Sequence, residues 1–563
     1  MTIRRILLAI TCTFLFTSAS TGAKVPKWLK SVRNSVFEVI AYDSEGQEKG
    51  RSHGFFIDSD GTGISDRSVF VGADRAVTVD AAGIERPVNL ILGANDMYDV
   101  VRFSVTPDKK LKSVTLSPVM SSKGNTVSVL PYSTDKKAGI VGACIGLTMD
   151  LQNDRYYYNL ETAFDSSYVG CPVMDEDGMA IGIVQAGTQG DEMTYALDAR
   201  FVKDIEINAI SLGERAYTAL NIRKSLPQDV DQALAYVFIR QSTASTAEYG
   251  RLLEDFLVQF PDNPDGLFNM GAYLITETDS TQYQRGLEFI EKSIGLTDEK
   301  DRFLSDYANL IYQTATQEQS VFESWTLDKA LEITDQAIGI KEEPAYYQLQ
   351  GNILYALKRY DEAFESYEKL NSSDLASADT YLSQYAIYSQ MDGDPEKYIS
   401  LLDSVLGKLG TPMPPRASAL IIERASWKSQ AGHHREAVAD YNLYEKTVGS
   451  NTTTAQFHFT REQEEIKAKM YEQAIADINK ARQLAPDDPV LTLENASLLL
   501  RIGNCKAALP LLSELEESYP SNPDVQRLLG VCCQRLGNND KARIHLTRAK
   551  ELGDTVAAGL LEE

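Results

Sequence analysis

The sequence predicts a multidomain protein in which an all-β N-terminal part is followed by an all-α part built from repeats. Up to about residue 210, runs of β-branched residues alternate with turns rich in glycine and aspartate. From Ser211 onward, alanine, leucine, glutamate, glutamine and tyrosine recur at helical spacing instead. The third observation is a sequence unit that recurs at a fixed spacing in the C-terminal part. Because 563 residues exceed one typical domain, we predict separate domains over residues 24–210 and 211–563.

The C-terminal part repeats every 34 residues. Equivalent alanines stand at Ala474, Ala508 and Ala542. Linkers with two prolines occupy residues 261–264, 486–489 and 520–523. Their second proline suits the first turn of a helix, and a small residue follows seven positions later, where two helices must approach closely. This combination is typical of tetratricopeptide repeats, and we expect about eight or nine of them from Tyr217 to the end of the chain, forming an all-α solenoid.

Stacked repeats of this kind offer an inner face, built mainly from the first helix of each repeat, to a peptide or a partner protein. The side chains that ordinary repeat geometry would direct toward that face are Asn352, Tyr355, Arg501, Arg527 and Arg535. For each of them, simple exposure or packing within the repeat is the alternative role. The predicted partner is therefore a protein or peptide bound by the repeats.

Cysteines of neighbouring repeats form a candidate disulfide pair. Cys505 begins the second helix of one repeat, while Cys533 lies beside Cys532 in the first helix of the next. An oxidising compartment would allow a disulfide between Cys505 and Cys533, with packed free thiols as the alternative. No paired Cys-x-x-Cys spacing is present, so the sequence predicts no metal site, and it predicts no cofactor.

Several motifs stand in order between residues 26 and 205. They read SHGFFI at 52–57, SDRSVFVGA at 65–73, YDVVRF at 98–103, SSYVGCPVMDEDGMAIGIVQAG at 166–187 and YAL at 195–197. In their order and spacing these motifs resemble the HtrA/Deg-like family of trypsin-fold serine peptidases. The resemblance covers about a third of the chain. It implies that the β-rich part is a trypsin-like double barrel.

Where the resemblance places the catalytic triad, this sequence has Ser68, Asp99 and Val169. A serine in place of the histidine offers no nitrogen that takes up a proton near neutral pH, and a valine in place of the serine offers only methyl groups. The family's oxyanion hole uses the nucleophile's N–H and that of a glycine two residues earlier, which is Ser167 here. The resemblance therefore implies a pseudopeptidase without catalytic residues.

Two alternatives to a non-catalytic scaffold follow from the same residues. An active peptidase could use a relocated nucleophile, either Ser166 or Cys171, the latter paired with His53, the only histidine in this domain. A holdase-like periplasmic chaperone would bind many unfolded clients through the repeats. Selective binding of one partner distinguishes a scaffold from such a chaperone.

The N-terminus predicts export. Arg4 and Arg5 precede an apolar run over residues 6–16, and small residues end at Ala23, so residues 1–23 read as a cleavable signal peptide. We therefore expect the protein in the periplasm or cell envelope. No later segment approaches 18 consecutive apolar residues, which argues against an integral membrane segment. A net charge of −25 argues against nucleic-acid binding, because phosphate backbones repel such a surface.

Overall fold

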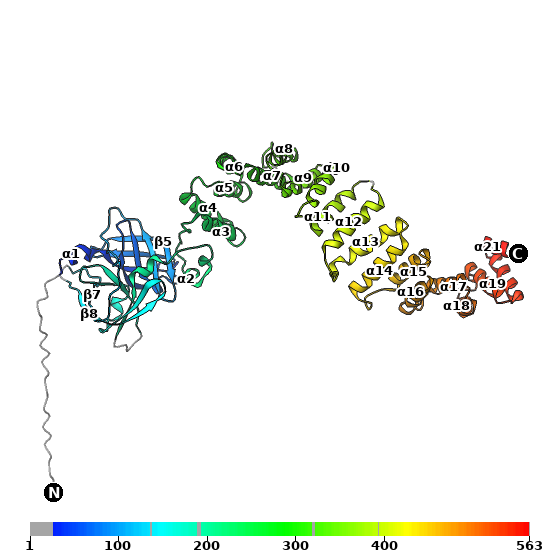
Figure 1. The fold of residues 1–563 in the computed structure, drawn as a ribbon, viewed down its shortest axis with the longest axis horizontal. Helices are drawn as coiled ribbons and strands as arrows, with labels where there is room; N and C mark the ends of the chain where they lie inside the picture. Colours follow the sequence, from blue (N-terminus) through cyan, green and yellow to red (C-terminus); the bar gives the residue numbers. More distant parts are fainter. Residues whose placement is uncertain (1–25, 136–137, 188–192, 318–320, 392, 562–563) are drawn as a thin grey trace, which may run out of the picture. The chain divides into compact units, whose positions relative to one another are not determined.

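The structure, a computed structural model, describes residues 26–135, 138–187, 193–317, 321–391 and 393–561. The expected signal peptide over residues 1–23 lies outside the described residues. The chain divides into two compact units, one ending at Leu296 and one beginning at Thr297. Each unit is described by itself below (Figure 1).

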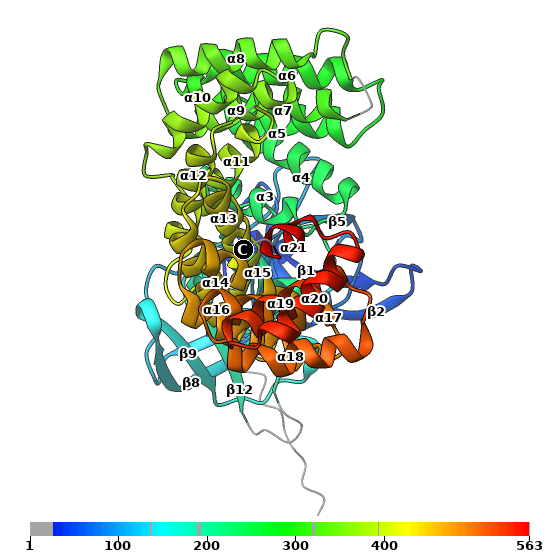
Figure 2. The same ribbon diagram turned by 90° about the vertical axis from the view of Figure 1, so that its right-hand side faces the viewer.

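Two closed antiparallel barrels of six strands form the β-rich part of the first unit. The first has the strand order β1-β2-β3-β6-β5-β4 and the second the order β10-β11-β12-β9-β8-β7. In the first barrel the strands are β1 (Val36–Tyr42), β2 (Glu48–Phe56), β3 (Thr62–Asp66), β4 (Arg75–Asp80), β5 (Glu85–Asn95) and β6 (Val100–Val105). In the second they are β7 (Thr126–Val129), β8 (Val141–Leu151), β9 (Arg155–Leu160), β10 (Pro172–Met174), β11 (Ala180–Val184) and β12 (Thr194–Asp198). This confirms the predicted trypsin-like double-barrel architecture, and Figure 2 shows β8, β9 and β12 side by side.

Each barrel has its own apolar core, and a third core joins them. Aromatic rings of Phe37, Phe56, Phe70 and Phe103 fill the first barrel. Aliphatic side chains from both barrels meet in the third core, which also receives Leu29 of the short helix α1 (Leu29–Val32). Buried positions alternate with exposed or half-buried ones along much of β5 and β6, which places one face of each strand in these cores. The two barrels therefore pack against one another through a shared apolar core.

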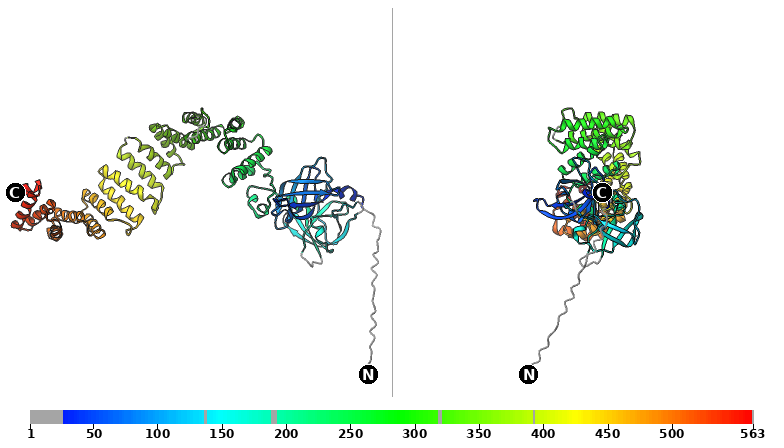
Figure 3. Two further views of the ribbon diagram at one scale, coloured as in Figure 1. Left: turned by 180° about the vertical axis from the view of Figure 1, so that it is seen from behind. Right: turned by 90° about the vertical axis from the view of Figure 1, so that its left-hand side faces the viewer.

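Helices follow the barrels, in antiparallel pairs (Figures 1 and 3). In the first unit these are α2 (Arg215–Thr218), α3 (Val230–Gln241), α4 (Thr246–Gln259), α5 (Pro264–Thr276) and α6 (Tyr283–Leu296). In the second unit they are α7 (Lys300–Thr316), α8 (Leu327–Ile340), α9 (Pro344–Ala356), α10 (Tyr360–Asn371), α11 (Ala378–Tyr388), α12 (Pro395–Lys408), α13 (Ser418–Gln430), α14 (His434–Val448), α15 (Ala455–Lys467), α16 (Tyr471–Leu484), α17 (Pro489–Arg501), α18 (Cys505–Ser518), α19 (Pro523–Arg535), α20 (Asn539–Glu551) and α21 (Thr555–Leu560). The described residues thus hold nine successive helix pairs from α3 to α20, in agreement with the expected number of repeats.

The helix starts follow the linker pattern of the sequence. Pro264, Pro489 and Pro523 each stand at the beginning of a helix, as predicted. The residue before each proline caps the helix by accepting a backbone N–H bond through its side chain. The expected close approach is also present: a Cβ on Gly530 would lie 2.5 Å from the side chain of Leu546 on the neighbouring helix. Proline and small residues therefore set the register of these repeats.

The segment from residue 205 to 226 packs against the first barrel, although the composition changes at Ser211. Tyr217 and Leu220 belong to the apolar core of that barrel, and the Tyr217 hydroxyl accepts the Ala94 N–H at 3.1 Å. Backbone bonds tie Ile91 of β5 to Arg223 and Ser225. The first helix pair begins only at Val230, so the repeat start expected at Tyr217 is corrected to a later position. Burial of Tyr217 in the barrel is the reason.

Candidate functional site

The position expected for a general base lies at the end of β3. Ser68 begins a single 3₁₀ turn over Ser68–Phe70. Its hydroxyl donates a hydrogen bond to the Asp66 carboxylate at 2.9 Å, and its backbone N–H donates to the same carboxylate at 2.8 Å. Asp66 is buried, and burial together with the nearby Asp99 charge raises the pKa of its carboxyl group. Ser68 is therefore engaged by a neighbour two residues away along the chain.

Asp99, which the resemblance aligns with the triad aspartate, precedes β6 with a positive φ of 43°. Its carboxylate lies 3.3 Å from the Arg67 guanidinium, and its carbonyl accepts the Arg67 N–H at 2.8 Å. The Asp99 side chain is 54% exposed, whereas Arg67 is buried and also donates to backbone carbonyls of the 205–226 segment. The carboxylate thus pairs with a structural arginine. An aspartate that orients a histidine would instead need an imidazole N–H as its partner.

The loop that carries Val169 uses its own backbone donors. Asp165 caps a 3₁₀ turn over Ser166–Tyr168 and accepts the Ser167 N–H at 2.9 Å. The Val169 N–H donates to the Ser166 carbonyl at 3.3 Å. These are the two N–H groups that would form the oxyanion hole implied by the resemblance. In this loop conformation both of them point to oxygen atoms of the loop itself.

Gly170 fixes this loop against β2. Its φ is +81°, and a Cβ built there would lie 2.0 Å from the carbonyl oxygen of His53. A glycine is therefore required both by the left-handed backbone and by the close approach. The Val169 carbonyl in turn accepts the His53 N–H at 3.3 Å. The glycine of the peptidase-like motif thus has a packing role that does not depend on catalysis.

The structure places His53 and Cys171 near this loop without joining them as an acid–base pair. Cys171 is 0% exposed within the core of the second barrel, and burial raises the pKa of its thiol to about 12. The His53 ring stacks on Tyr132 at 5.7 Å, and burial lowers the pKa of its imidazole. Among the described residues, its Nδ1 atom has no hydrogen-bond partner. A thiol held protonated in an apolar core is a poor nucleophile.

The five repeat residues predicted for binding differ in their surroundings. Asn352 accepts a hydrogen bond from Tyr367 at 2.7 Å, and Tyr355 packs on Tyr360 while 41% exposed. Arg527 is committed to Asp554, at 2.6 Å, and to Asp524.

Arg501 and Arg535 are exposed. They lie at the C-terminal ends of α17 and α19, the first helices of successive repeats, and Arg535 donates to the Leu500 carbonyl. The structure therefore leaves Arg501 and Arg535 as the most accessible cations of the set.

The C-terminal cysteines pack as thiols. All five described cysteines, Cys505 and Cys533 among them, are free. Cys532 rather than Cys533 shares the apolar core around Cys505, and its Sγ lies 3.2 Å from the Cys505 carbonyl oxygen. Burial raises the pKa of Cys532 to about 11. The pairing of Cys505 with Cys533 stays a prediction.

Buried charges in α15 and α16 are the feature that sequence reasoning missed. Asp477 lies between Arg461 and His458, and Glu462 and Glu465 are also buried. The available signal was the run Arg-Glu-Gln-Glu-Glu at 461–465, which occupies positions where an amphipathic repeat helix needs apolar residues. Among the described residues, no group of three or more His, Cys, Asp or Glu side chains is arranged to hold a metal ion.

Residues 465–532 match the tetratricopeptide repeat family. The matched segment runs from the end of α15 into α19 and includes the helix pair α17–α18. No curated protein matches the chain. None of the described helices is long and apolar enough to cross a bilayer.

Proposed function

We propose that this protein is an exported, non-catalytic scaffold that binds a protein partner through its tetratricopeptide repeats. The observation that carries the proposal is the stack of helix pairs, in which residues 465–532 match the repeat family. Repeats of this kind present long continuous surfaces to other proteins. Export is supported by the N-terminal sequence, with its two arginines, apolar run and terminal small residues.

The N-terminal part is proposed to be a degenerate relative of HtrA/Deg-like peptidases. Ser68 and Val169 replace the reactive groups, and the N–H groups of Ser167 and Val169 donate within their own loop. Loss of triad members leaves only the weak catalysis that an oxyanion hole and substrate binding supply. With those N–H groups occupied, this residual catalysis is lost as well. The double barrel then serves as a structural base for the helices that follow.

We expect no peptidase activity from the full-length protein. Neither fluorophosphonate labelling nor casein turnover should rise above background, with trypsin as the positive control. The double variant Ser68→His with Val169→Ser should remain at least about 10²-fold below an intact peptidase, because one missing oxyanion donor alone costs that much. Turnover by the wild type that disappears in Cys171→Ala or Ser166→Ala would contradict the proposal.

Partner binding should depend on exposed cations at the ends of successive first helices. Reversing Arg501 and Arg535 together to Glu should lower the affinity for a partner that carries carboxylates by about tenfold or more, with unchanged helicity. The measurement is a pull-down from the envelope fraction with mass spectrometry, followed by titration of the purified partner.

The matched control reverses two exposed lysines of second helices, Lys480→Glu with Lys506→Glu, which changes the net charge equally. One stoichiometric partner whose recovery falls only in the arginine variant supports the scaffold. A heterogeneous set of unfolded proteins would instead identify a holdase-like chaperone. Equal loss in both variants would show that overall charge, rather than this position on the repeats, controls binding.

A further inference from the structure

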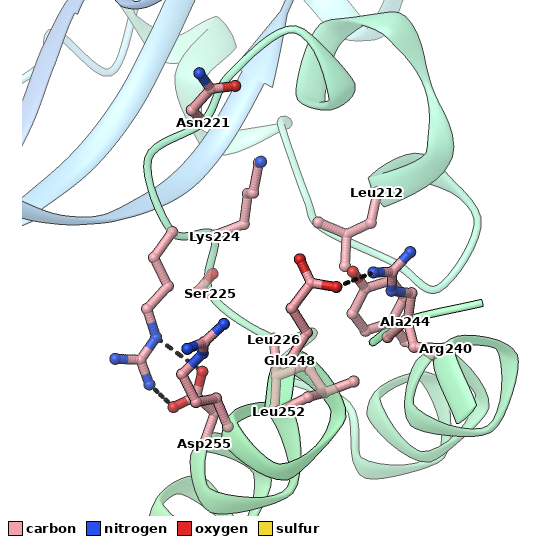
Figure 4. Close-up of a pocket in the computed structure, with 13 residues that line it drawn as sticks. Leu212, Asn221, Lys224, Ser225, Leu226, Arg240, Ala244, Glu248, Leu252 and Asp255 are labelled. Atoms are coloured by element: carbon pink, nitrogen blue, oxygen red, sulfur yellow. Dashed lines mark hydrogen bonds and ion pairs between the residues drawn. The ribbon is translucent and has the colours of Figure 1, made fainter. Parts of the chain in front are cut away.

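A pocket of about 370 Å³ lies within the first unit, between the segment after the barrels and the helices α3 and α4 (Figure 4). Leucine side chains at positions 212, 226 and 252 supply apolar wall. Four cationic side chains and only two carboxylates complete the charged lining. The cations are Arg223, Lys224, Arg240 and Arg251, and the carboxylates are Glu248 and Asp255. The pocket therefore combines apolar surface with an excess of two positive charges.

Two of these cations are positioned by the barrel. Lys224 pairs with Ile91 of β5 through a β-bridge. The Arg223 carbonyl accepts the Ile91 N–H at 2.8 Å, and the Ser225 N–H donates to the Ile91 carbonyl at 2.9 Å. These bonds hold the backbone of residues 223–225 as an added edge of the sheet. The pocket wall that carries Arg223 and Lys224 is thus a fixed part of the fold.

Each of the two carboxylates is already hydrogen-bonded, Asp255 to a cation of the pocket itself and Glu248 to the start of α4. Asp255 accepts the Arg223 Nε–H at 2.8 Å. Glu248 accepts both the backbone N–H and the hydroxyl of Ser245, at 3.0 Å each, in the capping box of α4. The Arg240 guanidinium approaches Glu248 only to 3.9 Å. Neutralisation of the cations inside the pocket is therefore incomplete.

Lys224 is the clearest example of this incomplete neutralisation. Its ammonium donates to the Leu220 carbonyl, and in the part of the chain that the structure describes, neither Lys224 nor Arg251 has an ion-pair partner. Burial and the nearby Arg240 charge lower the pKa of the Lys224 ammonium. The chain has 80 acidic residues against 55 basic ones, so a convergence of unpaired cations runs opposite to its overall composition. An anion entering the pocket would offset this repulsion.

We propose that this pocket binds a phosphate monoester with an apolar body, whose phosphate is held by Lys224, Arg240 and Arg251. A phosphate monoester carries close to two negative charges near neutral pH, which matches the excess of two positive charges in the lining. Guanidinium groups suit phosphate through paired N–H donors, and the leucines accommodate the apolar body. Such a ligand would contact the barrel-bound segment and α4 together, and so fasten this helix to the barrel.

Phenyl phosphate is the probe that tests this site in the full-length protein. Isothermal titration calorimetry should give one binding site. Binding should weaken below about pH 6, where the ester loses its second charge. Affinity should fall by about tenfold or more in Lys224→Met and in Arg240→Met, because each removes one charge-assisted contact. Lys112→Met, at an exposed position that does not line the pocket, is the matched control and should bind as the wild type does.

Hydrogen exchange by mass spectrometry provides a second readout that needs no variant. Phenyl phosphate should slow amide exchange in peptides covering residues 220–226 and 236–255, and should leave the second barrel unaffected. Absence of binding at millimolar phenyl phosphate, or equal binding by Lys224→Met and Arg240→Met, would overturn the proposal. Tighter binding of phthalate would overturn the phosphate assignment, and equal binding of inorganic phosphate would overturn the role of the apolar body.

Discussion

Replacing Asp477 by alanine destabilises the repeats around α15 and α16 by about 3–5 kcal/mol, because it leaves a buried guanidinium without its main partner. Asp477 receives the Nε–H of Arg461 at 2.5 Å and a second guanidinium N–H at 2.8 Å. His458 lies 3.0 Å from the same carboxylate. After the substitution, Arg461 retains Glu445 at 2.7 Å and Asn442 at 2.9 Å, which do not replace the lost bidentate pair.

Urea titration of the full-length protein by far-UV circular dichroism measures this loss. Hydrogen exchange of peptides from α15 and α16 locates it. Asp487→Ala is the matched control, because Asp487 is exposed in the turn between α16 and α17 and should have little effect. An Asp477→Ala protein as stable as the control would show that Arg461 finds equivalent partners without this carboxylate. The network would then have no structural role.

Replacing Glu462 and Glu465 by glutamine stabilises the same repeats at pH 8, by about 1–3 kcal/mol for each residue. The two side chains are 0% and 3% exposed, one turn apart on α15. One carboxylate oxygen of each has no hydrogen-bond partner among the described residues. Burial and neighbouring acids raise the pKa of Glu462 to about 7 and that of Glu465 to about 8. Both carboxyls are therefore most stable with a proton bound.

The charged neighbours come from α15 itself and from α16 and α17. Glu494 and Arg501 of α17 act on Glu462, Asp477 of α16 acts on both acids, and Arg461 of α15 attracts Glu465. Because the repulsive and desolvating effects outweigh the attraction, the folded state holds these protons more tightly than the unfolded chain does. The stabilisation that these two protonated carboxyls contribute is fully present below the ordinary glutamate pKa of 4.5. It is lost as the pH rises through about 7 and 8.

The glutamine variants should therefore match the wild type near pH 4.5 and exceed it progressively up to pH 8. The quantity to compare is the difference in unfolding free energy between the variant and the wild type, measured by urea titration at each pH. Glu472→Gln, an exposed position on α16, is the control and should give a difference that does not vary with pH. A double variant whose difference stays constant over this range would show that the acids titrate alike in the folded and unfolded chains.

Helix placement in the repeats was predictable because its signals are local. Pro489 and Pro523 begin helices where the linker pattern places them. Their fixed φ and missing N–H suit a first turn whatever packs against it. The small residue seven positions later depends on one neighbouring helix only, as Gly530 against Leu546 illustrates. The double-barrel fold was predictable for a different reason, since a whole ordered set of motifs carried the resemblance.

The surroundings of single charged residues were not predictable. Arg501 and Arg527 look alike in sequence, yet Arg501 is exposed and Arg527 is paired with Asp554. The partner stands 27 residues away, on the cap of the last short helix. Whether a cation is available to a ligand depends on which side chain of another element reaches it. Packing determines which side chain this is, and the sequence shows no periodic pattern that would predict it.

By itself the sequence determined the two fold classes, the repeat period and the residues at the peptidase-like positions, because these depend on short-range backbone preferences and on residue identity. Only the tertiary structure decided what those residues contact. It directs the N–H groups of Ser167 and Val169 into their own loop and packs Tyr217 into the first barrel. It also gathers Lys224 and Arg240 around one pocket. Long-range contacts of this kind arise from the joint packing of many side chains, and no segment encodes them alone.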